Sequence, residues 1–464
     1  MFSSSRFRLL ALVLLGSAVI CLSSSPPGVS YDSVATRLLE TGLRSCEAFR
    51  MLQELTSQVP HRLSGSPGAA QAVGLTEKMM QERNFSKVHR EKIMVPHWVR
   101  GPVEEAMITH SDSRPDTPLT ICALGGSIAT PEQGIEAEVV EVKSFEQLHA
   151  LGAAAKGRII FFNRPMDRTK LNTFEAYGGA VDQRSRGAVE AARMGGVAAL
   201  VRSMTLALDD VPHTGVMGYL DSVKKVPAAA VSTVGAELLS RLLAQEKTVR
   251  IRLKLTCKTL PDEPSANVVG ELTGSEKPDE VIVVGGHLDC WDKGQGAHDD
   301  GGGCMQAIEV VNLLRDLGLR PKRTIRAVMF MNEENGDRGG KAYPVAPERS
   351  GERTVAAIES DAGSHAPRGF GIQADSTVVA KVQRWRPLFE RLNAGRLEVG
   401  YSGVDVSPTV ERGVPGFGLS VETHRYFNYH HSDNDTIDKV NSRELEMGAI
   451  VEALLCYLIS EEGL

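Results

Sequence analysis

The chain has 464 residues, of which 42% are hydrophobic and 24% charged, with 45 Gly and 22 Pro. This composition excludes collagen-like and disordered proteins, and the length predicts two domains rather than one. The formal charge of -6 lacks the positive excess that nucleic acid binding requires, so we expect no nucleic acid partner.

The first 25 residues have the order of a secretory signal. Arg6 and Arg8 precede an apolar run at residues 9–22, and serines follow it. The run is shorter than the roughly 20 residues that span a bilayer; an uncleaved anchoring helix is the alternative. We therefore expect an exported protein without stable membrane insertion, secreted or in the lumen of the ER, Golgi or lysosome in a eukaryote, periplasmic in a bacterium. Export would permit disulfides, but the spacing of the six remaining cysteines selects no pairing.

Apolar residues with helical spacing extend from residue 31 to 85, with a break at 63–68. Short extended runs follow at residues 118–123, 138–142 and 158–162. The section then alternates a helix at 188–194, a strand at 197–202 and a helix at 235–243. This order predicts a smaller α/β domain inserted at residues 127–256. Residues 26–126, whose start could be a propeptide, and residues 257–464 would form the larger domain around it.

Three strongly apolar segments, residues 281–286, 324–331 and 355–358, are each followed at once by polar or charged side chains. A helical pattern at 305–317 separates the first two, and Gly318 is placed to end it. Such runs of Val and Ile with crossover helices predict a parallel or mixed sheet covered on both faces. Because ligands bind beyond the carboxyl ends of such strands, the charged residues should converge at one edge.

The residues at that edge are nearly all carboxylates and imidazoles. They occur in five clusters, at residues 287–289, 298–300, 332–335, 359–361 and 430–436. Carboxylates mixed with imidazoles suit zinc or a similar divalent ion. One such cluster could be a solvated polar rim, but five after successive strands indicate a site. The sequence lacks the HExxH motif, the Gly-x-Ser-x-Gly elbow and the glycine-rich nucleotide loops, which argues against the enzymes that use them.

These clusters resemble the ligand set of the zinc-dependent exopeptidases with co-catalytic metals. Further motifs extend the resemblance over roughly residues 45–460, at 62–66, 124–130, 202–203, 212–215, 294–296 and 413–416. The resemblance implies a mixed or parallel sheet flanked by helices, interrupted by a protease-associated-like insert. It also implies two Zn²⁺ per subunit, a homodimer, and hydrolysis of short peptides, especially dipeptides with free ends.

The resemblance assigns five metal ligands, one residue at a time. Asp299 would bridge both zinc ions, His287 and Asp361 would complete one site, and Glu334 and His431 the other. Two divalent ions carry four positive charges, which these three carboxylates largely balance, so the centre can be partly buried.

Two further carboxylates have catalytic roles in this interpretation. Glu333 would hold the bridging water and act as general base. Asp289, two residues after His287, would fix the orientation and tautomer of that imidazole. Asp299 and Asp300 correspond to a dipeptide that contains a cis peptide bond in the family.

Three assignments stay open. His430 could replace His431 as the ligand, although the spacing to residues 435–436 favours His431. His213 could reach the substrate or only cap a turn. Asp405 lies in a loop that is near the substrate in relatives.

Three other functions compete with a dipeptidase or carboxypeptidase. A zinc aminopeptidase would act on longer chains, and a glutaminyl cyclase would use a single zinc ion. A non-catalytic binding ectodomain would have lost ligands, whereas all five ligands and Glu333 are present.

Overall fold

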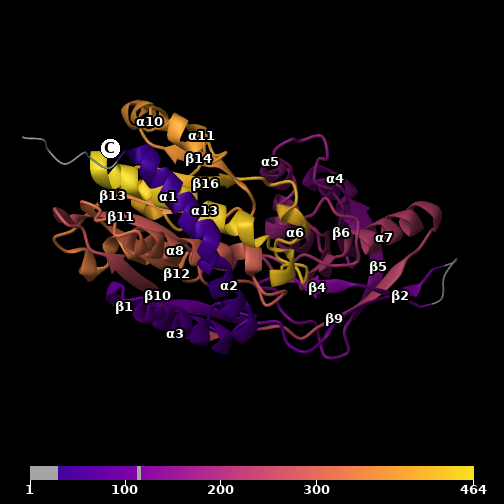
Figure 1. Ribbon diagram of the computed structural model, residues 1–464. Helices are drawn as coiled ribbons and strands as arrows, with labels where there is room; N and C mark the ends of the chain where they lie inside the picture. The colour runs from indigo at the N-terminus through magenta and orange to yellow at the C-terminus, as the bar shows by residue number, and fades with distance from the viewer. Residues whose placement is uncertain (1–29, 112–115) are drawn as a thin grey trace, which may run out of the picture.

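The computed structural model describes residues 30–111 and 116–464, so the predicted signal at 1–25 lies outside the described residues. Two eight-stranded sheets form two lobes that lie side by side (Figure 1). This mixed α/β architecture confirms the predicted fold class. No helix of the described residues has the length and hydropathy that crossing a membrane would require. The six described cysteines are all unpaired.

The first sheet has the strand order β1-β10-β12-β11-β13-β16-β14-β15. Its centre is parallel, because β11 pairs in parallel with both β12 and β13, and β13 with β16; antiparallel pairs occur toward both edges. The strands are β1 (Ser86–Val99), β10 (Lys258–Leu272), β11 (Lys277–His287), β12 (Arg323–Phe330), β13 (Arg353–Glu359), β14 (Pro367–Gln373), β15 (Arg396–Val399) and β16 (Gly416–Val421).

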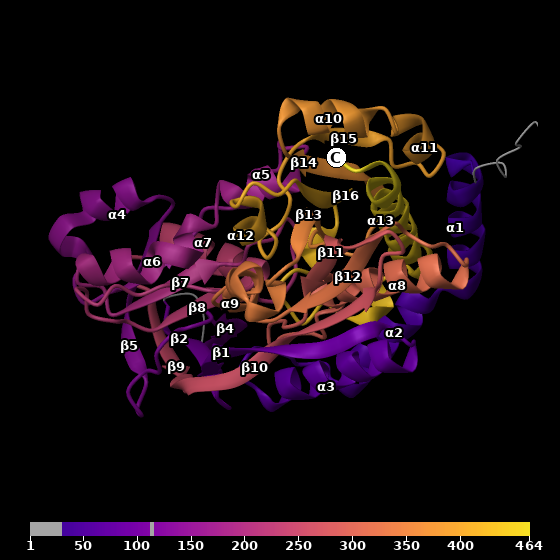
Figure 2. The ribbon, with the colours of Figure 1, turned by 90° about the vertical axis from the view of Figure 1, so that its left-hand side faces the viewer.

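Both faces of this sheet are buried, as the apolar runs predict. In β11, Ile282 and Val284 belong to the large core, whereas Val281 and Val283 belong to a smaller core on the opposite face. Figure 2 shows α8 and α13 on one side of β11 and β12, and α9 and α12 on the other. The helices of this lobe are α1 (Tyr31–Ser45), α2 (Glu47–Gln58), α3 (Pro67–Glu82), α8 (Gly302–Asp316), α9 (Arg338–Ala342), α10 (Ser376–Gln383), α11 (Arg386–Glu390), α12 (Ser407–Val410) and α13 (Ser442–Glu462).

The second sheet has the order β3-β2-β9-β5-β6-β7-β8-β4. Neighbouring residues of β6 face different cores, with Ile159 in one and Ile160 in the other, so helices and loops cover this sheet on both sides too. Its strands are β2 (Glu104–His110), β3 (Thr117–Leu119), β4 (Ile121–Ala123), β5 (Ile135–Val142), β6 (Ile159–Phe162), β7 (Ala198–Arg202), β8 (Ala228–Val231) and β9 (Arg250–Leu255). Its helices are α4 (Phe145–Leu151), α5 (Thr173–Gly178), α6 (Asp182–Arg193) and α7 (Thr233–Gln245).

Three strands of the second sheet, β2, β3 and β4, precede residue 127. This sheet therefore contains chain from both sides of the boundary expected there. The reason is pairing across a long sequence separation, since β2 pairs with β9 and β4 pairs with β8. The domain bounds at residues 127 and 256 stay a prediction.

Candidate metal centre

The charged clusters meet beside the carboxyl ends of the parallel strands. His287 is the last residue of β11, and Asp361 lies two residues after β13. Glu333 and Glu334 follow β12 after a turn in which Asn332 has a φ of 77°, in the left-handed region. Asp299 lies in the segment η2 (Ala297–Gly301) ahead of α8, where Asp299 and Asp300 have non-helical backbone angles. Of these elements, β11, β12 and β13 correspond to the three apolar segments that the sequence predicts as strands.

Asp299 lies between two groups of side chains, and each of its oxygens faces one group. Its Oδ1 is 3.3 Å from His287 Nε2, which is 3.5 Å from Asp361 Oδ1. Its Oδ2 is 3.3 Å from His431 Nε2, which is 3.0 Å from Glu334 Oε2. The five residues named as ligands therefore form two adjoining groups that share one carboxylate.

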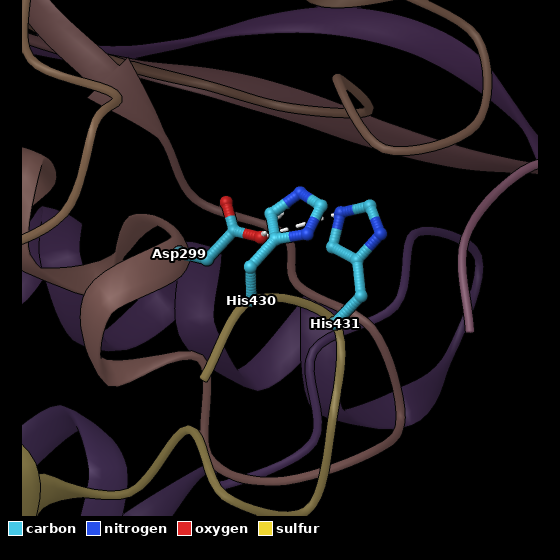
Figure 3. Close-up of side chains that lie close together, drawn as sticks. All are labelled: Asp299, His430 and His431. Atoms are coloured by element: carbon cyan, nitrogen blue, oxygen red, sulfur yellow. Dashed lines mark ion pairs between the residues drawn. The ribbon is translucent and has the colours of Figure 1, made fainter. Parts of the chain in front are cut away.

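His430 also lies beside this carboxylate (Figure 3). Its Nε2 is 3.8 Å from Asp299 Oδ2, and its ring stacks on His431 with centroids 3.5 Å apart. His431 is nearer to Asp299 and also contacts Glu334, so the geometry favours His431 as the ligand. The left-handed backbone of His431, with a φ of 61°, turns the two consecutive imidazoles to the same side.

The spacing of the donor atoms fits zinc. Ligands at about 2.0–2.1 Å from a tetrahedral zinc ion lie about 3.3 Å from one another. The four separations given above are 3.0 to 3.5 Å. In addition, the buried Asp299 Oδ2 and Asp361 Oδ1 accept no hydrogen bond within the described chain, as expected of atoms that ligate a cation.

The pKa shifts in the cluster also indicate that it binds positive charge. Burial raises the pKa of Glu334 well above its usual value, and the nearby carboxylate of Asp299 raises it further. Burial likewise raises the pKa of Asp361. Burial tends to lower the pKa of His287, but the carboxylates of Asp361 and Asp299 raise it well above normal. Divalent ions would remove this conflict between neighbouring carboxylates.

Asp289 orients His287, although not through its carboxylate. His287 Nδ1 donates to the backbone carbonyl of Asp289 at 2.9 Å, whereas the nearest carboxylate oxygen is 4.0 Å away. This hydrogen bond places the proton on Nδ1 and leaves the Nε2 lone pair for a metal. The Asp289 carboxylate instead accepts from the backbone amides of Asn332 and Glu333, at 2.7 and 3.0 Å. It thereby fixes the turn that presents Glu333.

Glu333, which precedes the predicted ligand Glu334, is half-buried. Burial raises the pKa of its carboxyl well above the ordinary value; His287 opposes this shift, and Asp361 and Asp299 add to it. A carboxylate with a raised pKa is a stronger proton acceptor, which is what a general base near neutral pH needs.

The cis peptide bond expected between Asp299 and Asp300 is present. Asp300 Oδ2 accepts from the His287 backbone amide at 3.0 Å, and Oδ1 accepts from the Gly303 amide at 3.1 Å. Asp300 therefore connects the end of β11 to the start of α8.

Several residues without an assigned role in the sequence hold the predicted ligands in place. Asp435 accepts from the backbone amides of His298 and Asp299, at 2.7 and 3.1 Å. The Trp291 amide donates to Glu334 Oε1 at 3.2 Å. Arg62, which is fully buried, donates to the carbonyls of Leu288, Gln295 and Gly296. The only sequence signal for Asp435 and Arg62 is that both belong to motifs of the resemblance.

His213 and Asp405 are both buried. His213 Nδ1 donates to the His430 carbonyl at 2.7 Å, so His213 anchors the loop that carries the two histidines. Burial lowers the pKa of His213 to about 4 and keeps it neutral. The carboxylate oxygens of Asp405 accept no hydrogen bond within the described chain. Substrate contact by either residue stays a prediction.

The second lobe holds two of the ligand loops. Trp291 belongs to one of its hydrophobic cores, and Tyr426 and Phe427, which begin the short 3-10 turn η5 (Tyr426–Asn428), belong to the other. The backbone amide of Thr214 donates to the His431 carbonyl at 2.9 Å. The loops that carry the predicted ligands are therefore held by contacts between the two lobes.

A buried histidine near the site predicts acid lability. His365 stacks on His298 with centroids 4.5 Å apart, and burial lowers its pKa to about 4, helped by Arg425 and opposed by Glu422. The folded state keeps His365 neutral, whereas the unfolded state binds a proton below pH 6.5, so stability falls between pH 6.5 and 4. The expected loss at pH 5 is about 2 kcal/mol.

The variant His365→Phe should not show this loss of about 2 kcal/mol at pH 5. The free energy of unfolding in urea, measured at pH 7 and at pH 5, tests this. His424→Phe, which changes an exposed histidine, is the control and should leave the difference between the two pH values unchanged. An identical pH dependence in wild type and His365→Phe would contradict the interpretation.

Comparison with known proteins identifies the family. The model of "Peptidase family M28" matches residues 267–455. Carboxypeptidase Q of Homo sapiens is 36% identical and covers 89% of this chain and 85% of its own length. Carboxypeptidase Q of Xenopus laevis is 36% identical and covers 93% of this chain and 90% of its own length.

Solved structures agree as well. The crystal structure of the Peptidase M28 precursor from Shewanella amazonensis has a TM-score of 0.87 at 34% identity, covering 93% of this chain and 96% of that one. A zinc aminopeptidase from Bacillus subtilis shares the fold, with a TM-score of 0.63 at 20% identity over 88% of this chain and 94% of that one. The fold and the relatives together define a zinc metallo-exopeptidase. The chain belongs to peptidase family M28, and within it to the group of the carboxypeptidases Q.

Proposed function

We propose that the protein is a binuclear zinc exopeptidase that hydrolyses short peptides, chiefly dipeptides with free ends. The observation that carries this proposal is the pair of ligand groups that share Asp299, because its two oxygens face different groups. His287 and Asp361 would complete one zinc site, and Glu334 and His431 the other. The name of the relatives, carboxypeptidase, supports an attack on the bond nearest a free carboxyl end.

Zinc held by these residues would supply Lewis acidity toward the peptide carbonyl and would lower the pKa of a water at the site. Glu333 then accepts the proton of the attacking water and later delivers it to the leaving amine. Asp289 holds Glu333 in position, because its carboxylate accepts hydrogen bonds from the backbone amides of Asn332 and Glu333. The Nδ1 hydrogen bond of His287 keeps its Nε2 directed at Asp299 and Asp361.

Metal removal and restoration test the proposal. Protein treated with a chelator should lose hydrolysis of a dipeptide such as Ala-Leu, and activity should return as zinc approaches two ions per chain. Calcium should not restore it, because the mixed imidazole and carboxylate set suits zinc. Full activity at one ion per chain would contradict a binuclear centre. Hydrolysis of leucine p-nitroanilide without hydrolysis of dipeptides would favour the aminopeptidase alternative.

We further propose that the protein acts as an exported homodimer, with the second lobe as a protease-associated-like insert that limits access to the site. The charged, apolar and small-residue order of the first 25 residues supports export. The contacts of residues 213 and 214 with the His430 and His431 backbone support a role of this lobe at the site.

A further inference from the structure

Arg100 is a buried arginine in the segment that connects the two lobes. It follows β1 of the first sheet and precedes β2 of the second, and it is only 8% exposed. Its guanidinium donates two hydrogen bonds to the Asp292 carboxylate, from Nε to Oδ2 at 2.9 Å and from Nη2 to Oδ1 at 2.6 Å. A bidentate pair of this kind fixes the orientation of both partners as well as their distance. Arg100 is therefore joined firmly to the loop that follows β11.

The same guanidinium also contacts the second lobe. Its Nη1 donates to Glu104 Oε1 of β2 at 3.0 Å and to the Ala123 carbonyl of β4 at 2.5 Å. Its Nη2 donates to Thr214 Oγ1 at 3.2 Å. Arg100 thus holds the loop of Asp292 in the first lobe against three segments of the second lobe.

The loop of Asp292 leads to the predicted ligand Glu334. The preceding residue, Trp291, donates its backbone amide to Glu334 Oε1 at 3.2 Å, and Glu334 Oε2 belongs to the predicted zinc site. The ring of Trp291 lies 6.3 Å from that of Trp98, centroid to centroid. A Cβ placed on Gly125 of the second lobe would lie 1.8 Å from the Trp291 ring, so the ring is closely packed. The position of the Trp291 amide therefore depends on the second lobe.

Thr214 leads to the predicted ligand His431. Its backbone amide donates to the His431 carbonyl at 2.9 Å. Its hydroxyl donates to the Ala123 carbonyl at 3.0 Å, which leaves the oxygen to accept from Arg100. The two loops that Arg100 reaches thus position Glu334 and His431, the two residues that would complete the same zinc site.

The group of His287 and Asp361 is held in a different way. Both residues follow strands of the first lobe, β11 and β13. The Leu288 amide donates to the last carbonyl of β12 at 2.6 Å, and the Leu288 carbonyl accepts from Arg62 Nε at 2.8 Å. The backbone next to His287 is therefore fixed without Arg100.

We infer that Arg100 is a positioning residue for one of the two predicted zinc ions, the ion that Glu334 and His431 would hold, and that it makes the affinity of this site depend on the second lobe. This inference rests on the proposed function. Residues that orient metal ligands typically contribute about 10- to 100-fold to metal affinity. Because Arg100 reaches only one of the two ligand groups, its loss should weaken the binding of one ion and spare the other.

Zinc affinity in two single-site backgrounds tests the inference. Asp361→Asn leaves the group of Glu334 and His431. His431→Asn leaves the group of His287 and Asp361, and asparagine tolerates the left-handed backbone at position 431. Arg100→Gln should raise the zinc Kd about 10- to 100-fold in the first background. In the second background it should raise the Kd by no more than about twofold, because sites without shared contacts act independently. Competition with a chromophoric zinc chelator measures both values.

Arg323→Gln is the matched control. Arg323 is also 8% exposed and pairs with the carboxylate of Glu280, at the end of the sheet opposite to the site, so its loss should leave both zinc affinities unchanged. Arg100→Lys keeps the charge but not the bidentate geometry, so it should lose less affinity than Arg100→Gln. Asp292→Asn removes the same pair from the other side and should reproduce the loss in the Asp361→Asn background alone. These two variants test the inference even if Arg100→Gln does not fold.

Thermal unfolding establishes whether each variant is folded. Equal losses of affinity in both backgrounds would show a general structural role and would overturn the inference, as would unchanged affinity in both. A loss confined to the His431→Asn background would overturn it too. Binding of fewer than two zinc ions by the wild type would instead refute the proposed binuclear centre.

Discussion

Replacement of Glu333 by glutamine should lower the kcat for dipeptide hydrolysis by roughly 10²- to 10⁴-fold or more, because it removes the proton acceptor. The glutamine side chain is nearly isosteric with the carboxylate. The hydrogen bond from the backbone amide of residue 333 to the Asp289 carboxylate is unchanged. The folded structure and the two metal groups should therefore persist. The measurement is steady-state turnover of Ala-Leu together with the number of zinc ions per chain.

The adjacent Glu334 provides the matched control. Its Oε2 lies 3.0 Å from His431 Nε2, so Glu334→Gln should lose zinc, whereas Glu333→Gln should retain about two ions. Two neighbouring glutamates would thus give opposite metal contents with similar losses of activity. Unchanged turnover in Glu333→Gln, or loss of its zinc, would remove Glu333 from the role of base.

The variant Asp299→Asn should have the largest effect on metal binding, because both ligand groups share this one carboxylate. An amide cannot supply two anionic oxygens, so we expect at most one zinc ion per chain and no measurable hydrolysis. Zinc that binds only the folded state stabilises it by about 2.7 kcal/mol at 100 times its Kd. The increase of Tm that zinc gives the wild type should therefore be much smaller in Asp299→Asn.

Differential scanning fluorimetry with and without zinc measures this difference, and elemental analysis gives the stoichiometry. Asp438→Asn is a suitable control, because that carboxylate is 65% exposed and outside the site. If Asp299→Asn bound two ions and kept the full zinc-dependent increase of Tm, the shared carboxylate would not be a bridge.

Local sequence identifies the central strands and the residues that follow them, for a physical reason. A strand buried on both faces must be a continuous apolar run, so Val281 to Val284 and Val328 to Phe330 are visible without a structure. A divalent ion of the zinc type requires imidazole and carboxylate donors, so His287, Glu334 and Asp361 are conspicuous at the ends of such runs.

Polar strands are not visible in this way. In β1, from Ser86 to Val99, charged residues occupy most of the first half, so the strand shows no apolar run. β10 contains Pro261 and Pro264, and proline disfavours a strand. β1 pairs with β10, and β10 also pairs with β12, and this pairing stabilises both strands. Paired residues lie up to about 185 positions apart in sequence, as for Ser86 and Glu271. Such stabilisation depends on tertiary contacts, which no local pattern reports.

The sequence alone thus determined the central strands and the carboxylates and imidazoles that follow them, because these follow from side-chain type and burial, while the roles of single residues, the base included, come from the family resemblance and stay predictions. The tertiary structure decided the geometry. It brings the two oxygens of Asp299 to different partners, makes the backbone carbonyl of Asp289 the contact of His287, and joins Arg100 to both Asp292 and Thr214. These contacts join segments that are distant in the chain or depend on which atom of a residue turns inward, and only the folded packing of both lobes fixes them.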